Sequence, residues 1–99
     1  VMGGQYQANG HARVVSNIID YGMDIQTAID FPRSFPENGC LKLEEGYSDK
    51  VASELENKGH KILRPDQPIG GSQAIMYDLK KDILIGGSDP RKDGCALGY

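Results

Sequence analysis

The longest regular pattern of apolar residues runs through positions 5–21. Its members recur at spacings of three, four and one, which places them on one face of a helix rather than on alternate sides of a strand. They are Ala8, Ala12, Val15, Ile18 and Ile19. Gly22 follows directly, where a glycine commonly ends a helix. The pattern therefore predicts a helix over residues 5–21.

A second, short helix is predicted over residues 25–31. Asp24 precedes it and can accept a hydrogen bond from the first free amides of the helix. Pro32 ends it, because proline disfavours the α conformation of the residue before it. Residues 33–39 contain a second proline and an Asn-Gly pair, which predicts an irregular loop that leads into a strand over residues 40–43.

A third helix is expected to begin after Ser48, which is a good N-cap residue, with Asp49 in the first turn where negative charge suits the helix dipole. It is expected to end at Lys58-Gly59. Its inward stripe consists of Val51, Ala52 and Leu55.

Three further strands are predicted at residues 60–63, 73–78 and 83–85, with a turn at 65–68 and a hairpin connection at 79–82. The tail, residues 86–99, is rich in Gly and Asp and predicts coil. No period repeats along the chain. Helices and strands in this order indicate an α/β or α+β class, with residues 1–99 forming a single unit of packed layers.

Charge and composition argue against several classes of partner. The net charge is -3 and the 11 Lys and Arg residues are scattered, which argues against nucleic-acid binding. No window approaches the roughly 18 apolar residues of a membrane span. The chain opens on Val1 rather than Met, so we expect a cut or processed piece of a longer protein.

The two cysteines do not suggest a metal or redox site. Cys40 and Cys95 lack CxxC spacing and have no histidine pair at ligand distance. Two free thiols are expected in preference to a disulfide, because two cysteines alone do not make a disulfide framework. Neither a metal nor a cofactor is predicted.

The residues Gly3-Gly4 are the first candidate for chemistry, since they stand directly before the long helix. A helix start leaves backbone N–H groups without internal partners at the positive end of the dipole. Such a place can hold an anion or the oxygen of a tetrahedral intermediate. The alternative is a simple turn, and the pattern alone favours the turn.

Two other glycine-rich segments, 70–73 and 86–91, do not match a phosphate-binding loop and are interpreted as turns around the strand pair. Within the second, Asp89 and Arg91 are candidates for a buried ion pair that fixes the tail.

The remaining polar residues offer little catalytic signal. His11 and His60 are interpreted as surface or packing residues without a partner for catalysis. Glu44 and Glu45 are neighbours on a strand, so they point to opposite faces, and they are interpreted as a solvated strand end. No serine lies in a GxSxG nucleophile elbow.

A series of ordered blocks, spread over essentially the whole chain, resembles the gamma-glutamyltransferase family. The blocks are Gly3-Gly4, VSNIIDYGMD at 15–24, AIDFPR at 28–33, EGYS at 45–48, KGH at 58–60, GSQAIM at 71–76, GSDPR at 87–91 and the final Gly98-Tyr99.

The resemblance implies an N-terminal-nucleophile hydrolase with a four-layer αββα sandwich, made as a precursor that cleaves itself into a large and a small subunit. The chain resembles the C-terminal part of the small subunit. Its partners would be the large subunit, the remainder of the small subunit and a gamma-glutamyl substrate. The nucleophilic threonine would lie upstream of Val1, and Thr27 does not match it. Gly3 and Gly4 match the glycines whose amides stabilise the oxyanion.

The implied reaction cleaves gamma-glutamyl amides such as glutathione through an acyl-enzyme, and passes the acyl group to water, an amino acid or a peptide. One departure concerns the substrate. Met2 stands where many transferases have proline, and residues 5–7 follow an acylase-like pattern. An acylase of the same fold and a non-catalytic relative are therefore the alternatives.

Overall fold

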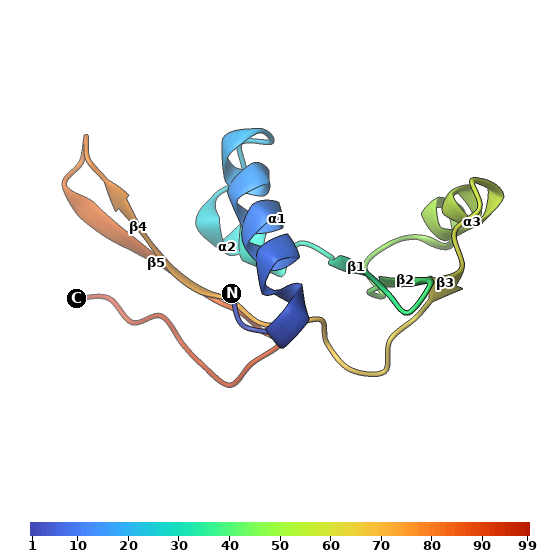
Figure 1. The fold of residues 1–99 in the computed structure, drawn as a ribbon. Helices are drawn as coiled ribbons and strands as arrows, with labels where there is room; N and C mark the ends of the chain where they lie inside the picture. Colours follow the sequence, from blue (N-terminus) through green and yellow to red (C-terminus); the bar gives the residue numbers. More distant parts are fainter. The chain divides into compact units, whose positions relative to one another are not determined.

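Three α-helices, one 3₁₀ helix and five strands make up the computed structural model, which describes residues 1–99. In chain order they are η1 (Gly4–Tyr6), α1 (Gln7–Ile19), α2 (Ile25–Asp30), β1 (Ser34–Glu37), β2 (Cys40–Leu43), α3 (Asp49–Asn57), β3 (Ile62–Leu63), β4 (Gln73–Asp78) and β5 (Ile83–Ser88). The class is α+β, as predicted. The chain divides into a terminal unit, Val1–Phe31 with Gly70–Tyr99, and an inserted unit, Pro32–Ile69 (Figure 1).

In the terminal unit, the predicted first helix is confirmed as η1 followed by α1. The face that α1 buries carries Tyr6 at its start, Gly10 and Asn17, and the Asn17 side chain donates to the carbonyl of Ala28 in α2 at 3.3 Å. The apolar residues that share another face are largely exposed, with Ile19 74% accessible. The spacing identified which residues share a face, but it did not identify the face that α2 covers.

The short helix α2 is capped as predicted. The Asp24 carboxylate accepts from the amide of Thr27 at 2.9 Å and from its hydroxyl at 2.6 Å. These hydrogen bonds, the hydroxyl foremost, lower the pKa of Asp24 from its ordinary 3.8, because they favour the charged form. The helix buries Ile25, Ala28 and Ile29, so it supplies much of the core of this unit.

The strands β4 and β5 form an antiparallel ribbon that pairs Gln73 with Ser88 and Asp78 with Ile83. The prediction of β4 is confirmed at both ends, but the prediction that coil begins at Gly86 is wrong, since β5 continues to Ser88. The reason is close packing at Gly87, where an added Cβ would lie 2.9 Å from Ile29 Cδ1. Glycine here lets the strand approach α2, rather than marking a turn.

One face of this ribbon is apolar and largely uncovered. Ile75, Tyr77 and Leu84 project from the face opposite Ala74 and Gly87, and Ile75 and Leu84 are 74% and 69% accessible. In Figure 1 the far end of the ribbon projects beyond α2. No helix of the chain is both long and apolar enough to cross a membrane.

The inserted unit contains a three-stranded sheet in the order β1-β2-β3, antiparallel between β1 and β2 and parallel between β2 and β3. The loop predicted over residues 33–39 is wrong, because β1 and a tight hairpin turn occupy it. Asn38 and Gly39 both adopt positive φ, 51° and 76°, as a two-residue hairpin requires. Pro36 is tolerated because β1 is an edge strand, where a missing N–H costs no ladder bond.

The helix α3 agrees with its predicted signals. The Ser48 hydroxyl accepts from the amide of Val51 at 3.2 Å, and Gly59 follows the end of the helix with φ 99°. Ala52 is buried and Leu55 half-buried, whereas Val51 of the predicted stripe is exposed at 36%. The predicted strand over 60–63 is shorter, at Ile62–Leu63.

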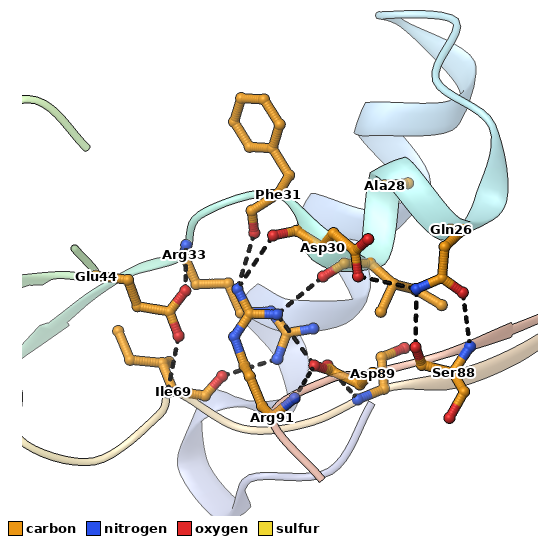
Figure 2. A network of polar contacts seen from close by, with 12 residues as sticks. Gln26, Ala28, Asp30, Phe31, Arg33, Glu44, Ile69, Ser88, Asp89 and Arg91 are labelled. Atoms are coloured by element: carbon orange, nitrogen blue, oxygen red, sulfur yellow. Dashed lines mark hydrogen bonds and ion pairs between the residues drawn. The ribbon is translucent and has the colours of Figure 1, made fainter. Parts of the chain in front are cut away.

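The interpretation of Glu44 as a solvated strand end is wrong. Its carboxylate accepts from the amide of Arg33 at 2.9 Å and from the amide of Ile69 at 3.0 Å, so it ties together the two ends of the inserted unit (Figure 2). The buried Arg33 side chain adds a bond to the Ile69 carbonyl at 2.8 Å. Glu45, by contrast, is exposed.

Replacing Glu44 with Gln is expected to loosen this closure. An amide side chain has a single acceptor oxygen, so one of the two backbone N–H groups loses its partner, at a cost of about 1–3 kcal/mol. Hydrogen exchange of the full-length protein should show about tenfold or faster exchange at the amides of Arg33 and Ile69. Glu45→Gln is the matched control and should change neither. Equal exchange in the two variants would show that Glu44 does not close the unit.

Candidate functional site

The candidate residues Gly3 and Gly4 lie at a sharp turn in the terminal unit, where the chain passes from an isolated β-bridge at Met2 into η1. Met2 donates to the Gly71 carbonyl at 2.7 Å, and Gly71 donates back to the Met2 carbonyl at 3.2 Å. The backbone φ is then 139° at Gly3 and 56° at Gly4, values that residues with a side chain rarely adopt. The turn thus carries the chain from an extended segment into a helix within two residues.

The amide N–H groups of Gly3 and Gly4 donate to no group of the chain. The carbonyls of the same residues are occupied, since Tyr6 donates to Gly3 O at 3.1 Å and Gln7 donates to Gly4 O. No side chain caps this helix start. Both glycines are exposed. Two neighbouring donors at the positive end of a helix can therefore receive an oxyanion from outside the chain.

The turn is supported by the buried side chain of Tyr6, which is 3% accessible. The Tyr6 ring packs directly on glycine backbones: an added Cβ would lie 2.7 Å from the ring at both Gly10 and Gly70. At Gly70 it would also lie 2.6 Å from the Met2 carbonyl oxygen. The local sequence does not mark these two glycines as supports of the site, and the contacts of Gly70 with Met2 and Tyr6 are distant in sequence.

Gly70→Ala is expected to disrupt this support. The added methyl group meets a backbone oxygen that cannot move away without breaking the Met2–Gly71 pair, and overpacking of this kind costs about 1–3 kcal/mol. Gly22→Ala is the matched control, because Gly22 has nearly the same φ, 67° against 65°, and no atom within 4 Å of an added Cβ. Urea denaturation of the full-length protein should show the larger loss for Gly70→Ala. Equal losses would mean that backbone strain alone matters.

A buried ion pair fixes the segment that follows β5, as the sequence predicted. The Asp89 side chain is fully buried, and its Oδ1 accepts from Arg91 Nη1 at 3.1 Å. The same carboxylate accepts from the amide of Ser72 at 2.8 Å and from the amide of Arg91 at 2.9 Å. Ser72 is the neighbour of Gly71, so this carboxylate fixes the backbone next to the candidate site.

Arg91 also joins this segment to the end of α2, which the sequence did not predict. Its guanidinium donates to the carbonyls of Ile29 at 3.0 Å and Phe31 at 3.1 Å (Figure 2). These are orphan carbonyls of a helix C-terminus, which a cation there stabilises. The Arg91 side chain thus supplies hydrogen bonds both to the last carbonyls of α2 and to the buried carboxylate of Asp89.

Gln26 holds β5 from the other side. Its side-chain amide donates to the Ser88 carbonyl at 2.8 Å and accepts from the Ser88 amide at 3.0 Å, as a neighbouring strand would (Figure 2). Nothing in the local sequence marks Gln26, because its partner lies 62 residues away.

The other polar candidates are not brought together. His11 and His60 are exposed and lie in different units. The hydroxyl of Thr27 is used in the cap of α2. Cys40 and Cys95 are free thiols. No group of three or more His, Cys, Asp and Glu side chains is placed to hold a metal ion.

Comparison with known proteins supplies the family. The family model of gamma-glutamyltranspeptidase matches residues 1–99. The chain is 37% identical over 82 residues to the acylase ACY 1 proenzyme of Pseudomonas sp. (strain V22), covering 83% of this chain and 14% of the relative. It is 32% identical over 104 residues to the glutathione hydrolase-like YwrD proenzyme of Bacillus subtilis (strain 168), covering 97% of this chain and 20% of the relative.

Solved structures of other proteins share the fold of this chain. The cephalosporin acylase of Bacillus halodurans superposes with a TM-score of 0.88 at 35% identity, over 100% of this chain and 20% of that one. A gamma-glutamyltranspeptidase of Pseudomonas nitroreducens complexed with L-DON shares the fold, with a TM-score of 0.81 at 23% identity, over 92% of this chain and 49% of that one. The chain spans only 14% to 20% of these curated relatives. With the family model matching from end to end, the chain belongs to the gamma-glutamyltranspeptidase family, whose named members here are enzymes.

Proposed function

We propose that this chain is the oxyanion-binding part of an enzyme that cleaves gamma-glutamyl amides, glutathione among them, through an acyl-enzyme. The observation that carries the proposal is the pair of amides at Gly3 and Gly4, which are exposed and make no hydrogen bond within the chain. Family membership supports the class of reaction, because the relatives include glutathione hydrolases and acylases.

In the proposed reaction, a threonine hydroxyl supplied by the polypeptide upstream of Val1 attacks the amide carbonyl. Its proton passes to a base, for which the α-amino group of the same threonine serves. The carbonyl oxygen becomes an oxyanion, and the amides of Gly3 and Gly4 donate to it. The base returns the proton to the amide nitrogen, so collapse of this intermediate expels a neutral amine and leaves an ester on the threonine. Water or an acceptor amine then attacks the ester and releases the acyl group.

The proposed partners are the large subunit and the remainder of the small subunit of one precursor. Two observations support this. The chain spans a small part of relatives that are named proenzymes. The ribbon of β4 and β5 is covered by α2 on one face and leaves Ile75, Tyr77 and Leu84 uncovered on the other. A second sheet against that face, with its own helices, would complete a four-layer αββα sandwich.

An acylase acting on another amide is the second candidate. The observation in its favour is the identity of 37% to the acylase proenzyme, against 35% to the glutathione hydrolase proenzyme of Escherichia coli (strain K12) and 29% to that of Bacillus subtilis (strain 168). Both candidates use the same oxyanion geometry, so the two amides do not distinguish between them.

The test is to express the full-length gene and assay release from a gamma-glutamyl anilide, with and without an acceptor dipeptide, beside release from an acyl-cephalosporin. Faster release with the dipeptide is expected for the transferase, and release from the cephalosporin alone would select the acylase. No release from either substrate, together with an uncleaved precursor, would reject both and leave a non-catalytic relative.

A further inference from the structure

Met2 carries the exposed apolar side chain that lies nearest along the chain to the two free amides. Gly3 and Gly4 have no side chain, and the Tyr6 side chain is 3% accessible. Gln5 is exposed but polar. Met2 is 47% accessible, and its carbonyl carbon is bonded to the nitrogen of Gly3. A group that the Gly3 amide binds therefore has the Met2 side chain as a close neighbour.

Two hydrogen bonds hold the backbone of Met2 in place. Its N–H donates to the Gly71 carbonyl at 2.7 Å, and its carbonyl accepts from the Gly71 amide at 3.2 Å. Because the peptide bond between Met2 and Gly3 is trans, the N–H of Gly3 points opposite to the Met2 carbonyl, away from Gly71. An oxyanion held by this N–H therefore keeps a fixed position relative to the Cα of Met2.

The Met2 side chain projects away from α1. The preceding residue, Val1, packs on α1, since a Cβ added at Gly10 would lie 2.5 Å from Val1 Cγ1. Successive side chains of an extended segment point to opposite faces. The contacts of Gly71 agree, because residues opposite each other in a strand pair share a face. A Cβ added at Gly71 would lie 2.4 Å from Lys92 Cγ, in the segment that follows β5. Both observations place the thioether of Met2 beside the turn, on the face that α1 does not cover.

A substrate carbonyl bound at the turn lies within reach of this side chain. The Cα of Met2 is about 2.4 Å from the nitrogen of Gly3, and the bound oxygen is about 3 Å beyond that nitrogen. The sulfur of Met2 is three bonds from its Cα, and its three rotatable bonds let the side chain adapt to the substrate. A thioether is apolar and polarisable, and it makes favourable contacts with aromatic rings. The side chain therefore suits an apolar ring next to the scissile bond.

We propose that Met2 is a specificity-determining residue, whose thioether packs against an apolar ring attached to the scissile amide. The inference rests on the proposed function, because it takes Gly3 and Gly4 as the donors to the carbonyl oxygen. It deepens that function by naming a substrate class, amides with an apolar ring in the amine or in the acyl group. The contact is present in the bound substrate and in the transition state alike, so it lowers KM and leaves kcat unchanged.

Steady-state kinetics of the full-length protein with Met2→Ala test the proposal. Gamma-glutamyl anilide has a ring in the amine, phenylacetylglycine has a ring in the acyl group, and gamma-glutamylglycine has none. Each substrate is compared between the variant and the unsubstituted protein, which cancels the intrinsic reactivity of the amide. We expect kcat/KM to fall about 10-fold, through KM, for a substrate whose ring contacts Met2, and to stay within about twofold for gamma-glutamylglycine. The aromatic substrate that shows the loss identifies whether the ring lies in the amine or in the acyl group.

Met23→Ala is the matched control, because it makes the same chemical change beyond the far end of α1. It should leave the ranking of the three substrates unchanged. Met2→Gln keeps the length and the unbranched shape of the side chain but replaces the thioether with a polar amide. It should show the same selective loss as Met2→Ala, and it decides the question should Met2→Ala fail to fold.

NMR of the full-length protein labelled with ¹³C-methyl methionine gives a readout without catalysis. The signal of the Met2 methyl group is the one that Met2→Gln lacks. Unreactive analogues of the two aromatic substrates, in which CH2 replaces the scissile N–H, are added in turn. One of them should shift the Met2 signal upfield through its ring current and leave the Met23 signal in place. Such a shift without release of any amine would reject the proposed function and keep the binding role of Met2. Equal losses for all three substrates, a loss in kcat rather than in KM, or a Met2 signal that neither analogue shifts would overturn the proposal.

Discussion

Replacing the amide N–H of Gly4 with an ester oxygen is expected to lower kcat of the full-length enzyme by roughly 10²–10³-fold, or about 3 kcal/mol. The change substitutes glycolic acid for Gly4, so it removes one donor and leaves the φ of 56° accessible. Because the donor acts on charge that develops only in the transition state, kcat and kcat/KM should fall together while KM changes little. The same replacement at Gly3 should have an effect of similar size.

The control is the same ester replacement at Gly22, which also has a positive φ, has no atom within 4 Å of an added Cβ, and lies at the far end of α1. It should leave kcat unchanged. Steady-state kinetics with a gamma-glutamyl anilide provide the measurement, and a parallel melting curve shows that each variant is folded. A kcat within twofold of the unmodified enzyme for both Gly3 and Gly4 esters would remove the oxyanion role from this turn.

The parts of the fold that the sequence predicted well depend on contacts within a few residues. Asp24 and Ser48 cap their helices through the amides of Thr27 and Val51, three residues ahead in each case. Signals of this kind are complete in the local sequence, so the starts of α2 and α3 could be placed without knowledge of the rest of the chain. β4 was equally clear, because its apolar and β-prone run ends in turn residues.

The errors concern a missed local hairpin and two residues whose roles depend on distant packing. Pro36 and Asn38-Gly39 were interpreted as loop residues, yet the Asn-Gly pair forms a hairpin turn and Pro36 lies on an edge strand. Gly87 suggested a turn, although it lies within β5, where the absence of a side chain lets α2 pack against the strand. Glu44 suggested a solvated end, although it closes the inserted unit. For Gly87 and Glu44 the contacts that decide their roles lie elsewhere in the chain, whereas the Asn-Gly pair is a local hairpin signal between adjacent strands.

The candidate site was predictable only in its two central residues. Gly3 and Gly4 stand before a helix, and the family resemblance attached a role to them that remains a proposal. The contacts that support these two residues were not predictable, because Gly70 packs against Tyr6 and Met2, which are distant from it in the sequence. The sequence did suggest the pair of Asp89 and Arg91, which are two residues apart.

Asp89 is connected to the candidate site through the backbone. Its carboxylate and its amide hold the amide and the carbonyl of Ser72, at 2.8 and 3.1 Å. The next residue, Gly71, pairs with Met2, and Met2 precedes the turn at Gly3. The position of the two free amides therefore depends on a carboxylate that touches neither of them, and on the packing of Tyr6.

Asp89→Ala is expected to reduce the free energy of unfolding of the full-length protein by about 3–5 kcal/mol, the largest stability effect of any single substitution considered. Removing one partner of a buried ion pair leaves the other charge uncompensated, and here it also leaves the Ser72 amide without its acceptor. Asp93→Ala, an exposed aspartate in the same segment, is the control and should change stability by no more than about 0.5 kcal/mol. Urea denaturation provides the measurement.

A double-mutant cycle separates the ion pair from the other contacts of Asp89. Arg91→Met removes the charge and keeps much of the side-chain volume, so the combination with Asp89→Ala should be less destabilising than the sum of the two single changes. Arg91→Met alone still loses the bonds to the carbonyls of Ile29 and Phe31, and these losses persist in the double variant. Strict additivity, or a loss below about 1 kcal/mol for Asp89→Ala, would show that the buried carboxylate is not what holds the Ser72 backbone and the turn beyond it.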